Sequence, residues 1–459
     1  MRHVSPQLPL VAPWIAHAHA ADLAAMSALL DEQPALGALV QQDLEAGCAK
    51  NPRTGRPGLS GEQTLRLLLV RQLTGWTYAE LSFHLADSMT YRAFCRVGAL
   101  GATPSTSALA ATLRRVRPQT LATLNAQLVT SPAARRVERA TTVRMDATVV
   151  PVAIHHPTDS RLLLDAVRVL DRLLRRAEAT TGFTAYHRHV RRAKRRALEI
   201  PHLAPRATAR RRACYRDLLQ YTAVTASYAA CALAHLDGLA ATPARHRLRT
   251  QLTTFLPRVA RVIDQTTRRV LQGEAVPAGE KLVSLFEAHA DVLVKDRRDT
   301  YYGHKIFLTT GGSGLILDCA IPKGNPGDVT WTLPLLRRHR QRFGRPPRQA
   351  TFDGAFASQA NLADAKALGV ADVCFAKKRG LAVLDMARSQ WVYDRLRRFR
   401  AGIEGRISVL QRCYGLDRCP DHGADGMGRH VGWGIVTHNL AKIAQAQAAR
   451  ATRTARAAA

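Results

Sequence analysis

The feature that most constrains the fold is a strand pattern that stands alone in the first 300 residues. Residues 141–154, TTVRMDATVVPVAI, are rich in β-branched side chains that alternate with other residues, which is typical of a strand. Comparable patterns return only after residue 300. Because a lone strand is not stable, this segment must pair with the later strands. The helical stretch between them is therefore expected to be an insertion.

The strands after residue 300 alternate with helices. The segments YYGHKIFLTT (301–310) and GLILDCAIP (314–322) are joined by GGSG and predict a hairpin. Further strands are expected at RQATFDGAF, ending at Asp353, and at ADVCFA (371–376). Helices are expected at 330–343, 358–368, 391–414 and 430–449. This order predicts an α/β protein with a mixed sheet and helices against it, as in ribonuclease-H-like folds.

These patterns divide the chain into four parts. Residues 1–130 form an N-terminal helical domain, and 135–165 plus 296–445 form the ribonuclease-H-like catalytic domain. Residues 166–295 form a large, basic, all-helical insertion, and 446–459 form a flexible tail. In the N-terminal part, Ser60 with Gln63 and Thr77 with Glu80 form capping-box patterns on either side of Gly75. Two short helices around a glycine indicate a helix-turn-helix, a plain helical bundle or a dimerisation module.

The charge of the chain favours a polyanionic partner. Its 67 Lys and Arg residues against 35 Asp and Glu residues give a net charge of +32, and nucleic acid is the commonest polyanion. No apolar stretch reaches the length of a membrane span, so no membrane partner is expected. The eight scattered cysteines are typical of reduced thiols, and we expect a cytoplasmic, nucleoid-associated protein.

The positive charge is concentrated in the insertion. Between 186 and 216, eleven residues are basic and one, Glu199, is acidic. Two clusters there are expected to contact the phosphate backbone, unless they form a solvated helix face. The clusters consist of Arg191, Arg192, Lys194, Arg195 and Arg196, and of Arg210, Arg211 and Arg212.

Three acids stand out by position. Asp146 lies inside the first strand, Asp353 ends a later strand, and Glu404 lies on the helix after the last strand. An acid in an apolar strand is costly to bury unless it binds a cation or is paired. If the three converge, they offer oxygen ligands for two Mg²⁺ or Mn²⁺ ions and for in-line phosphoryl displacement. The alternative for each acid alone is a salt bridge or a helix cap.

Several segments resemble bacterial DDE-type insertion-sequence transposases, in particular an ISNCY-like group. They are, in order, GRPGLSGEQTLRLLLVRQLTGWTYAELSFHLADS, VRMDATVVPVAIHHPTDSRLLLDAV, DTYYGHKIFLTT, TFDGAF, RRFRAGIEGRISVLQR and GLDRCPDHGADGMGRHVGWGIVTHNLAKIA. The resemblance covers about residues 50–160 and 285–445. It implies that Asp146, Asp353 and Glu404 are the catalytic, metal-binding triad.

The resemblance also indicates DNA contacts near the glutamate. Arg400 fits the arginine of the family signature, whereas Arg397 stands at its tyrosine position. Gln411 stands at its lysine position, followed by Arg412. Arg397, Arg400 and Arg412 are expected to contact DNA. Lys305 is expected to be a second phosphate contact or a carboxylate contact or, alternatively, an ordinary edge-strand lysine.

The sequence therefore predicts a DNA transposase that cuts the ends of its element and joins them to target DNA. Its partner is double-stranded DNA, on which a homodimer or larger assembly is expected. The alternatives are a non-catalytic, sequence-specific DNA-binding relative and a stand-alone metal-dependent nuclease. A zinc site at Cys413, Cys419, His422 and His430 fits no standard ligand spacing.

Overall fold

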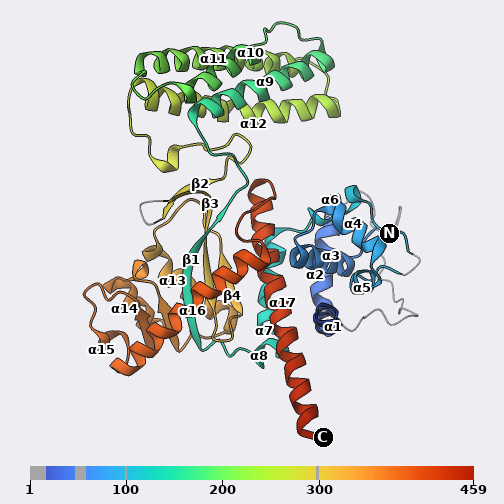
Figure 1. Ribbon diagram of the computed structural model, residues 1–459, viewed down its shortest axis with the longest axis vertical. Coiled ribbons are helices and arrows are strands. Elements are labelled where there is room, and N and C mark those ends of the chain that lie inside the picture. Colours follow the sequence, from blue (N-terminus) through green and yellow to red (C-terminus); the bar gives the residue numbers. More distant parts are fainter. Residues whose placement is uncertain (1–16, 47–57, 99–100, 296–298, 459) are drawn as a thin grey trace. The chain divides into compact units, whose positions relative to one another are not determined.

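The computed structural model describes residues 17–46, 58–98, 101–295 and 299–458. The chain is mixed α/β and divides into two compact units (Figure 1). The first unit contains Met1–Val150 and Lys305–Ala459, and the second contains Pro151–His304. Of the expected N-terminal domain, residues 1–16, 47–57 and 99–100 lie outside the described residues.

The first unit begins with helices whose ends follow the sequence signals. Both predicted capping boxes are confirmed: Ser60 and Gln63 bond reciprocally at the start of one helix, and Thr77 and Glu80 at the start of the next. Gly75 ends the first of these helices with φ +72°, a backbone conformation that glycine adopts without strain. The helices are α1 Ala18–Asp31, α2 Pro34–Ala46, α3 Gly61–Thr74, α4 Tyr78–Asp87, α5 Met89–Phe94, α6 Thr106–Leu113, α7 Pro118–Thr130 and α8 Pro132–Arg135.

A six-stranded mixed sheet follows, in the order β2-β3-β1-β5-β6 with β4 paired to β3; β2 and residues 299–304 of β3 belong to the second unit. β1 runs parallel to β5, and β5 runs parallel to β6. The predicted hairpin of β3 and β4 is confirmed as an antiparallel pair. Strand β2 was not predicted, because its short pattern follows directly on a helical one. The strands are β1 Thr142–Pro151, β2 Asp291–Lys295, β3 Asp299–Thr310, β4 Ile316–Ala320, β5 Gln349–Phe352 and β6 Asp372–Phe375.

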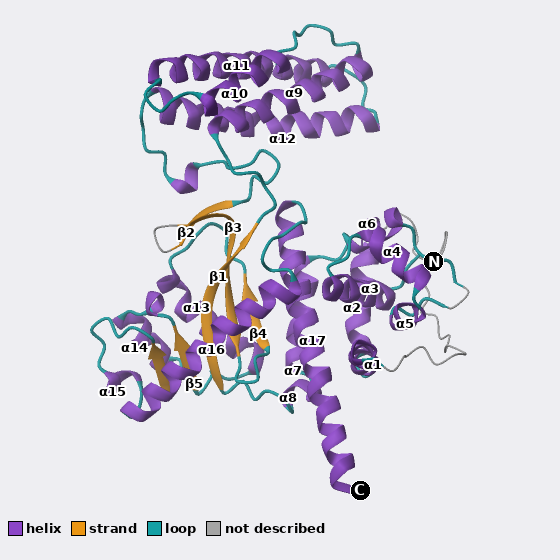
Figure 2. Cartoon of the chain, viewed as in Figure 1, coloured by secondary structure: helices purple, strands orange, loops and turns teal. Residues whose placement is uncertain are grey.

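Helices after the sheet cover it within the first unit. Helix α16 packs on β5 and β6, where the Tyr393 hydroxyl donates to the Phe375 carbonyl at 2.9 Å. Helix α17 packs on α1, α3, α7 and α16 (Figure 2). Residues 446–458, expected to be a flexible tail, continue α17. The helices are α13 Thr332–Phe343, α14 Gln359–Ala367, α15 Val383–Met386, α16 Gln390–Tyr414 and α17 Gly423–Ala458.

The second unit contains a bundle of helices around its own apolar core. The helices are α9 Asp159–Thr181, α10 Val190–Glu199, α11 Thr208–Asp237 and α12 Pro243–Thr266. Helix α9 buries a stripe of leucines, alanines and valines, as its 3.6-residue periodicity predicts. Its cap is Thr158, and the neighbouring Asp159 pairs with Arg269 at 3.0 Å. No helix among the described residues is long and apolar enough to span a membrane.

Two buried histidines of the first unit predict an acid-sensitive fold. Burial lowers the pKa of His339 and of His438 to about 4. Between pH 6.5 and 4 the unfolded chain therefore binds protons that the folded chain does not, so stability falls as pH falls through this window. Each histidine contributes up to about 3 kcal/mol. We expect His438→Gln to flatten the pH dependence of the unfolding free energy, measured by urea titration.

The exposed His246 provides the matched control for that measurement. His246→Gln should leave the slope between pH 4 and 6.5 as it is in the parent chain. An unchanged slope in His438→Gln would show that His438 is protonated in the folded chain as readily as in the unfolded one.

Candidate active site

The pairing of β1 with β5 brings two of the predicted acids together. The parallel register pairs Met145 of β1 with Phe352 of β5. Asp146 and Asp353, the residues that follow these two along the chain, therefore lie side by side. Asp353 follows directly on β5 and precedes a short 3-10 helix, Gly354–Phe356. Neighbouring strands lie about 4.8 Å apart, which is within the reach of two carboxylates that share a cation.

Helix α16 brings the third acid to the same point. The Arg400 guanidinium lies 3.3 Å from a carboxylate oxygen of Asp146 and 3.4 Å from one of Asp353. One turn further along the helix, Glu404 lies 3.5 Å from the same guanidinium. Residues four apart share a helix face, so Arg400 and Glu404 point toward the same strands. The three predicted acids therefore surround one positive charge.

The three carboxylates differ in their exposure to solvent. The side chain of Asp146 is 14% exposed, that of Asp353 is 40% exposed and that of Glu404 is 68% exposed. Burial raises the pKa of Asp146 to about 6, although the Ala147 amide and the charge of Arg400 partly oppose this. The inner end of the site is thus poorly hydrated, and an ionised Asp146 there requires a nearby cation.

A fourth carboxylate, which the sequence did not single out, contributes to the field at Asp146. The charge of Asp328 adds to the rise in the pKa of Asp146. Asp328 accepts a hydrogen bond from Lys305 at 3.0 Å, and Lys305 also donates to the Pro326 carbonyl at 2.9 Å. Lys305 is thus paired beside the acids rather than free. Asp328 follows Gly327 and begins a short 3-10 helix, Asp328–Trp331, that has no recognisable sequence motif.

The carboxylate oxygens of the three acids suit a hard divalent cation, but here they are arranged around the Arg400 guanidinium. Three carboxylates that face one point are the ligands that Mg²⁺ and Mn²⁺ prefer. Within the described part of the chain, no three Asp, Glu, His or Cys side chains approach closely enough to hold a metal ion as they stand. Arg400 would have to move aside before the acids could close around a metal ion.

A buried arginine fixes α16 against β1. Arg144 points to the same face of the sheet as Asp146, because it lies two residues earlier in the strand. Its guanidinium donates to Thr310 Oγ1 at 3.0 Å and to the Phe399 carbonyl at 2.9 Å, and it lies over the Phe399 ring. A Cβ atom on Gly402 would overlap Arg144 Nη1. Gly402 is therefore what lets Arg144 lie against the helix.

Two glycines of α16 give a matched pair of variants. We expect Gly402→Ala to displace Arg144 and to lower the unfolding free energy by about 2 kcal/mol, since it breaks hydrogen bonds of a buried charge. Gly405 has open space around it, so Gly405→Ala should raise stability by about 0.5–1 kcal/mol. Thermal unfolding of both variants checks this. Equal stability of the two would contradict the role given to Gly402.

The arginines predicted to contact DNA around the triad have different surroundings. Arg397 is 59% exposed, and its nearest carboxylate, on Asp394, is 3.8 Å away. Arg412 is exposed, and its Nε donates to the Ser408 carbonyl at 3.4 Å. Both can turn toward a ligand at little cost. Arg400, in contrast, is already surrounded by the three acids.

The basic clusters of the second unit divide into paired and unpaired residues. Arg196 bonds to Glu199 and Asp217, and Arg210 bonds to Glu199. Arg211 donates to backbone carbonyls of residues 203–205. The remaining members are exposed and make no ion pair within the described residues: Arg191, Arg192, Lys194, Arg195 and Arg212. Because paired arginines would lose a partner on binding phosphate, the unpaired ones are the better candidates.

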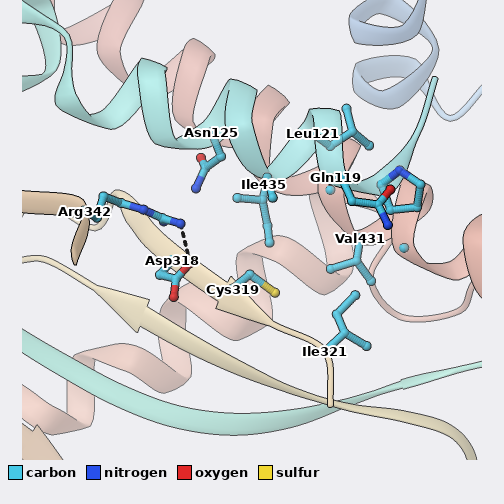
Figure 3. Close-up of a pocket in the computed structure, with 13 residues that line it drawn as sticks. Gln119, Leu121, Asn125, Asp318, Cys319, Ile321, Arg342, Val431 and Ile435 are labelled. Carbon is cyan, nitrogen blue, oxygen red and sulfur yellow. Dashed lines mark ion pairs between the residues drawn. The ribbon is translucent and has the colours of Figure 1, made fainter. Parts of the chain in front are cut away.

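Two other possible binding sites in the first unit are explained by hydrogen bonding and packing within the fold. His430, from the possible zinc ligands, bonds to the Gly415 carbonyl at 2.6 Å. A cavity of about 230 Å³ lies between α7, β4 and α17, and Arg342 and Asp318 at its edge pair at 2.7 Å (Figure 3). It is smaller than most ligand pockets, and none of the three acids lines it. We interpret it as a packing gap.

One stretch of the chain matches a known protein family. Residues 15–115 match the model of the family described as Transposase domain (DUF772). This match covers the helices α1 to α6 and supports a transposase family. No curated protein and no solved structure matches the chain.

Proposed function

We propose that this chain is a DDE-type DNA transposase of an ISNCY-like group with a ribonuclease-H-like catalytic core. The observation that carries the proposal is the meeting of Asp146, Asp353 and Glu404 around Arg400, from two parallel strands and one helix. The match of residues 15–115 to a transposase domain supports it independently. The sheet, with parallel neighbours β1, β5 and β6 and an antiparallel hairpin, is compatible with such a core.

In this proposal the acids hold Mg²⁺ or Mn²⁺, expected as two ions. Divalent cations bound there would activate the attacking oxygen and stabilise the leaving one in a phosphoryl displacement. Asp146 and Asp353 are fixed by the register of their strands, so their oxygens are preorganised. Glu404 is the most exposed of the three and can adjust as DNA enters. Arg400 neutralises the acids in the free chain and can then donate to a phosphate oxygen.

The proposed partner is double-stranded DNA, both the ends of the element and the target. The net charge of +32 favours this partner. Exposed Arg397, Arg412 and the unpaired cations of the second unit are the proposed backbone contacts. A homodimer or larger assembly on DNA is proposed because two ends must be joined to one target.

The test is metal-dependent cutting of the sequences that flank the gene. Duplexes carrying these flanks would be incubated with the chain and Mg²⁺, and the products analysed for free 3′ hydroxyl ends and for joining to a second duplex. Cleavage with joining supports a transposase. Cleavage without joining indicates a stand-alone nuclease, and sequence-specific binding without cleavage indicates a non-catalytic DNA-binding protein.

A further inference from the structure

Three cations of the first unit gather around the Gly311–Gly314 turn, with a single carboxylate, Glu138, beside it. They come from different elements: Arg144 from β1, Arg406 from α16 and Lys442 from α17. This turn joins the strands of the β3–β4 hairpin. None of the three cations makes an ion pair within the described residues, so the cluster differs from Arg400, which has three carboxylate partners.

Arg406 is the clearest member of this cluster. Its side chain makes no hydrogen bond to any described residue, and its Nε is buried and has no partner. It lies against the turn, since a Cβ atom on Gly314 would be 2.9 Å from Arg406 Nε. A buried N–H without an acceptor costs about 1–3 kcal/mol, and more when the group is charged. A missing acceptor is therefore expected next to Arg406.

Lys442 faces the same turn from α17. It lies one helical turn after His438, whose Nε2 is 3.1 Å from the Gly314 carbonyl. Burial, and then the charge of Arg406, lowers the pKa of Lys442. Arg406 and Lys442 are thus close enough for their charges to interact, and neither makes an ion pair within the described residues.

Arg144 completes the cluster on the side of the strands. Its hydrogen bonds go to the neutral acceptors Thr310 Oγ1 and the Phe399 carbonyl. Glu138 is the carboxylate beside the turn, where it accepts from the Ser313 amide at 2.8 Å and from the Ala140 amide at 2.9 Å. Three cations and one carboxylate leave an excess of two positive charges, which an anion would offset.

The position of the cluster indicates which kind of anion binds there. Arg144 lies two residues before Asp146 on the same face of β1, and Arg406 lies on α16, the helix that also carries Glu404. Two residues of a strand span about 7 Å, so one DNA strand can reach both the acids and the cluster. We propose that Arg406 and Lys442, with the charge of the buried Arg144 behind them, bind a backbone phosphate of the DNA strand held at the acids, a few nucleotides from the phosphate that is cut. This inference rests on the proposed function.

The first test uses inorganic phosphate as the probe and thermal unfolding of the full chain as the readout. We expect phosphate to raise the Tm of the parent chain and not that of Arg406→Gln or Lys442→Gln. Removing an uncompensated cation should leave these variants at least as stable as the parent without phosphate. Arg398→Gln, which changes an exposed arginine of the same helix, is the control and should respond like the parent. Equal gains in all four proteins, or no gain in the parent, would overturn the proposal.

The second test separates a DNA phosphate from a free one. The affinity for a 30-base-pair duplex would be measured by fluorescence anisotropy against salt concentration, without divalent cations. Losing one phosphate contact reduces the slope of log K against log salt by about 0.9. We expect this change in Arg406→Gln and not in Arg398→Gln. If phosphate stabilises the chain through Arg406 but the slope does not change, the site takes a free anion and the DNA proposal falls. Because neither assay needs cleavage, an inactive parent would overturn the proposed function alone.

Discussion

Asp146→Asn is expected to reduce strand cleavage by about 10³-fold or more while leaving DNA affinity unchanged. The amide has the size of the carboxylate but no charge, so it cannot hold a divalent cation beside Asp353. Loss of transition-state charge stabilisation worth about 4 kcal/mol corresponds to this factor. The measurement is the rate of 3′-hydroxyl formation on the flanking-sequence duplex at saturating protein, with binding followed in parallel.

The fold should survive this substitution, which keeps the result interpretable. Burial raises the pKa of Asp146, so its ionised carboxylate costs the folded chain free energy relative to the unfolded chain. The asparagine variant should unfold at the same temperature as the parent or at a higher one. Asp364→Asn, on the exposed surface of α14, is the control and should cleave normally. Undiminished cleavage by Asp146→Asn would remove this residue from the proposed mechanism.

Local signals explain why much of the fold could be predicted from the sequence. Capping boxes are short-range patterns, so the starts of α3 and α4 follow from residues three apart. The alternation of β1 and the glycine-rich turn of the β3–β4 hairpin are also local. Asp146 and Asp353 stood out because a carboxylate in or directly after an apolar strand is costly to bury without a partner. Glu404 lies on a helix, and its assignment depended on the resemblance to DDE-type transposases.

Interactions between distant parts of the chain could not be predicted in this way. Arg144 is bonded to partners 166 and 255 residues away, and nothing in its own segment indicates them. A signal was nevertheless present, since an arginine inside an apolar strand, two residues before Asp146, requires a partner on the same face. In the insertion, the sequence showed a run of arginines. It did not show that Glu199 and Asp217 neutralise Arg196.

Gly61→Ala is expected to be among the most destabilising single substitutions in the chain. Gly61 begins α3 where this helix crosses α2, and its amide donates to Gln41 Oε1 at 2.7 Å. A Cβ atom there would overlap the Gly37 carbonyl oxygen and would lie 2.5 Å from the Gln41 amide nitrogen. These are backbone atoms of a helix, so the two helices must separate.

Overpacking usually costs about 1–3 kcal/mol. We expect a loss of about 3 kcal/mol or more for Gly61→Ala, and a fall in Tm of roughly 5 °C or more for a unit of this size. Gly37→Ala is the matched control at the same crossing, because its Cβ would lie 3.3 Å from Glu62 Cα and needs only a small adjustment. Calorimetry of the two variants should therefore separate them by several degrees. If both unfold at the temperature of the parent chain, α2 and α3 do not cross at these glycines. Since α2 and α3 both lie within the residues that match a transposase domain, the same pair would also show whether DNA binding depends on this crossing.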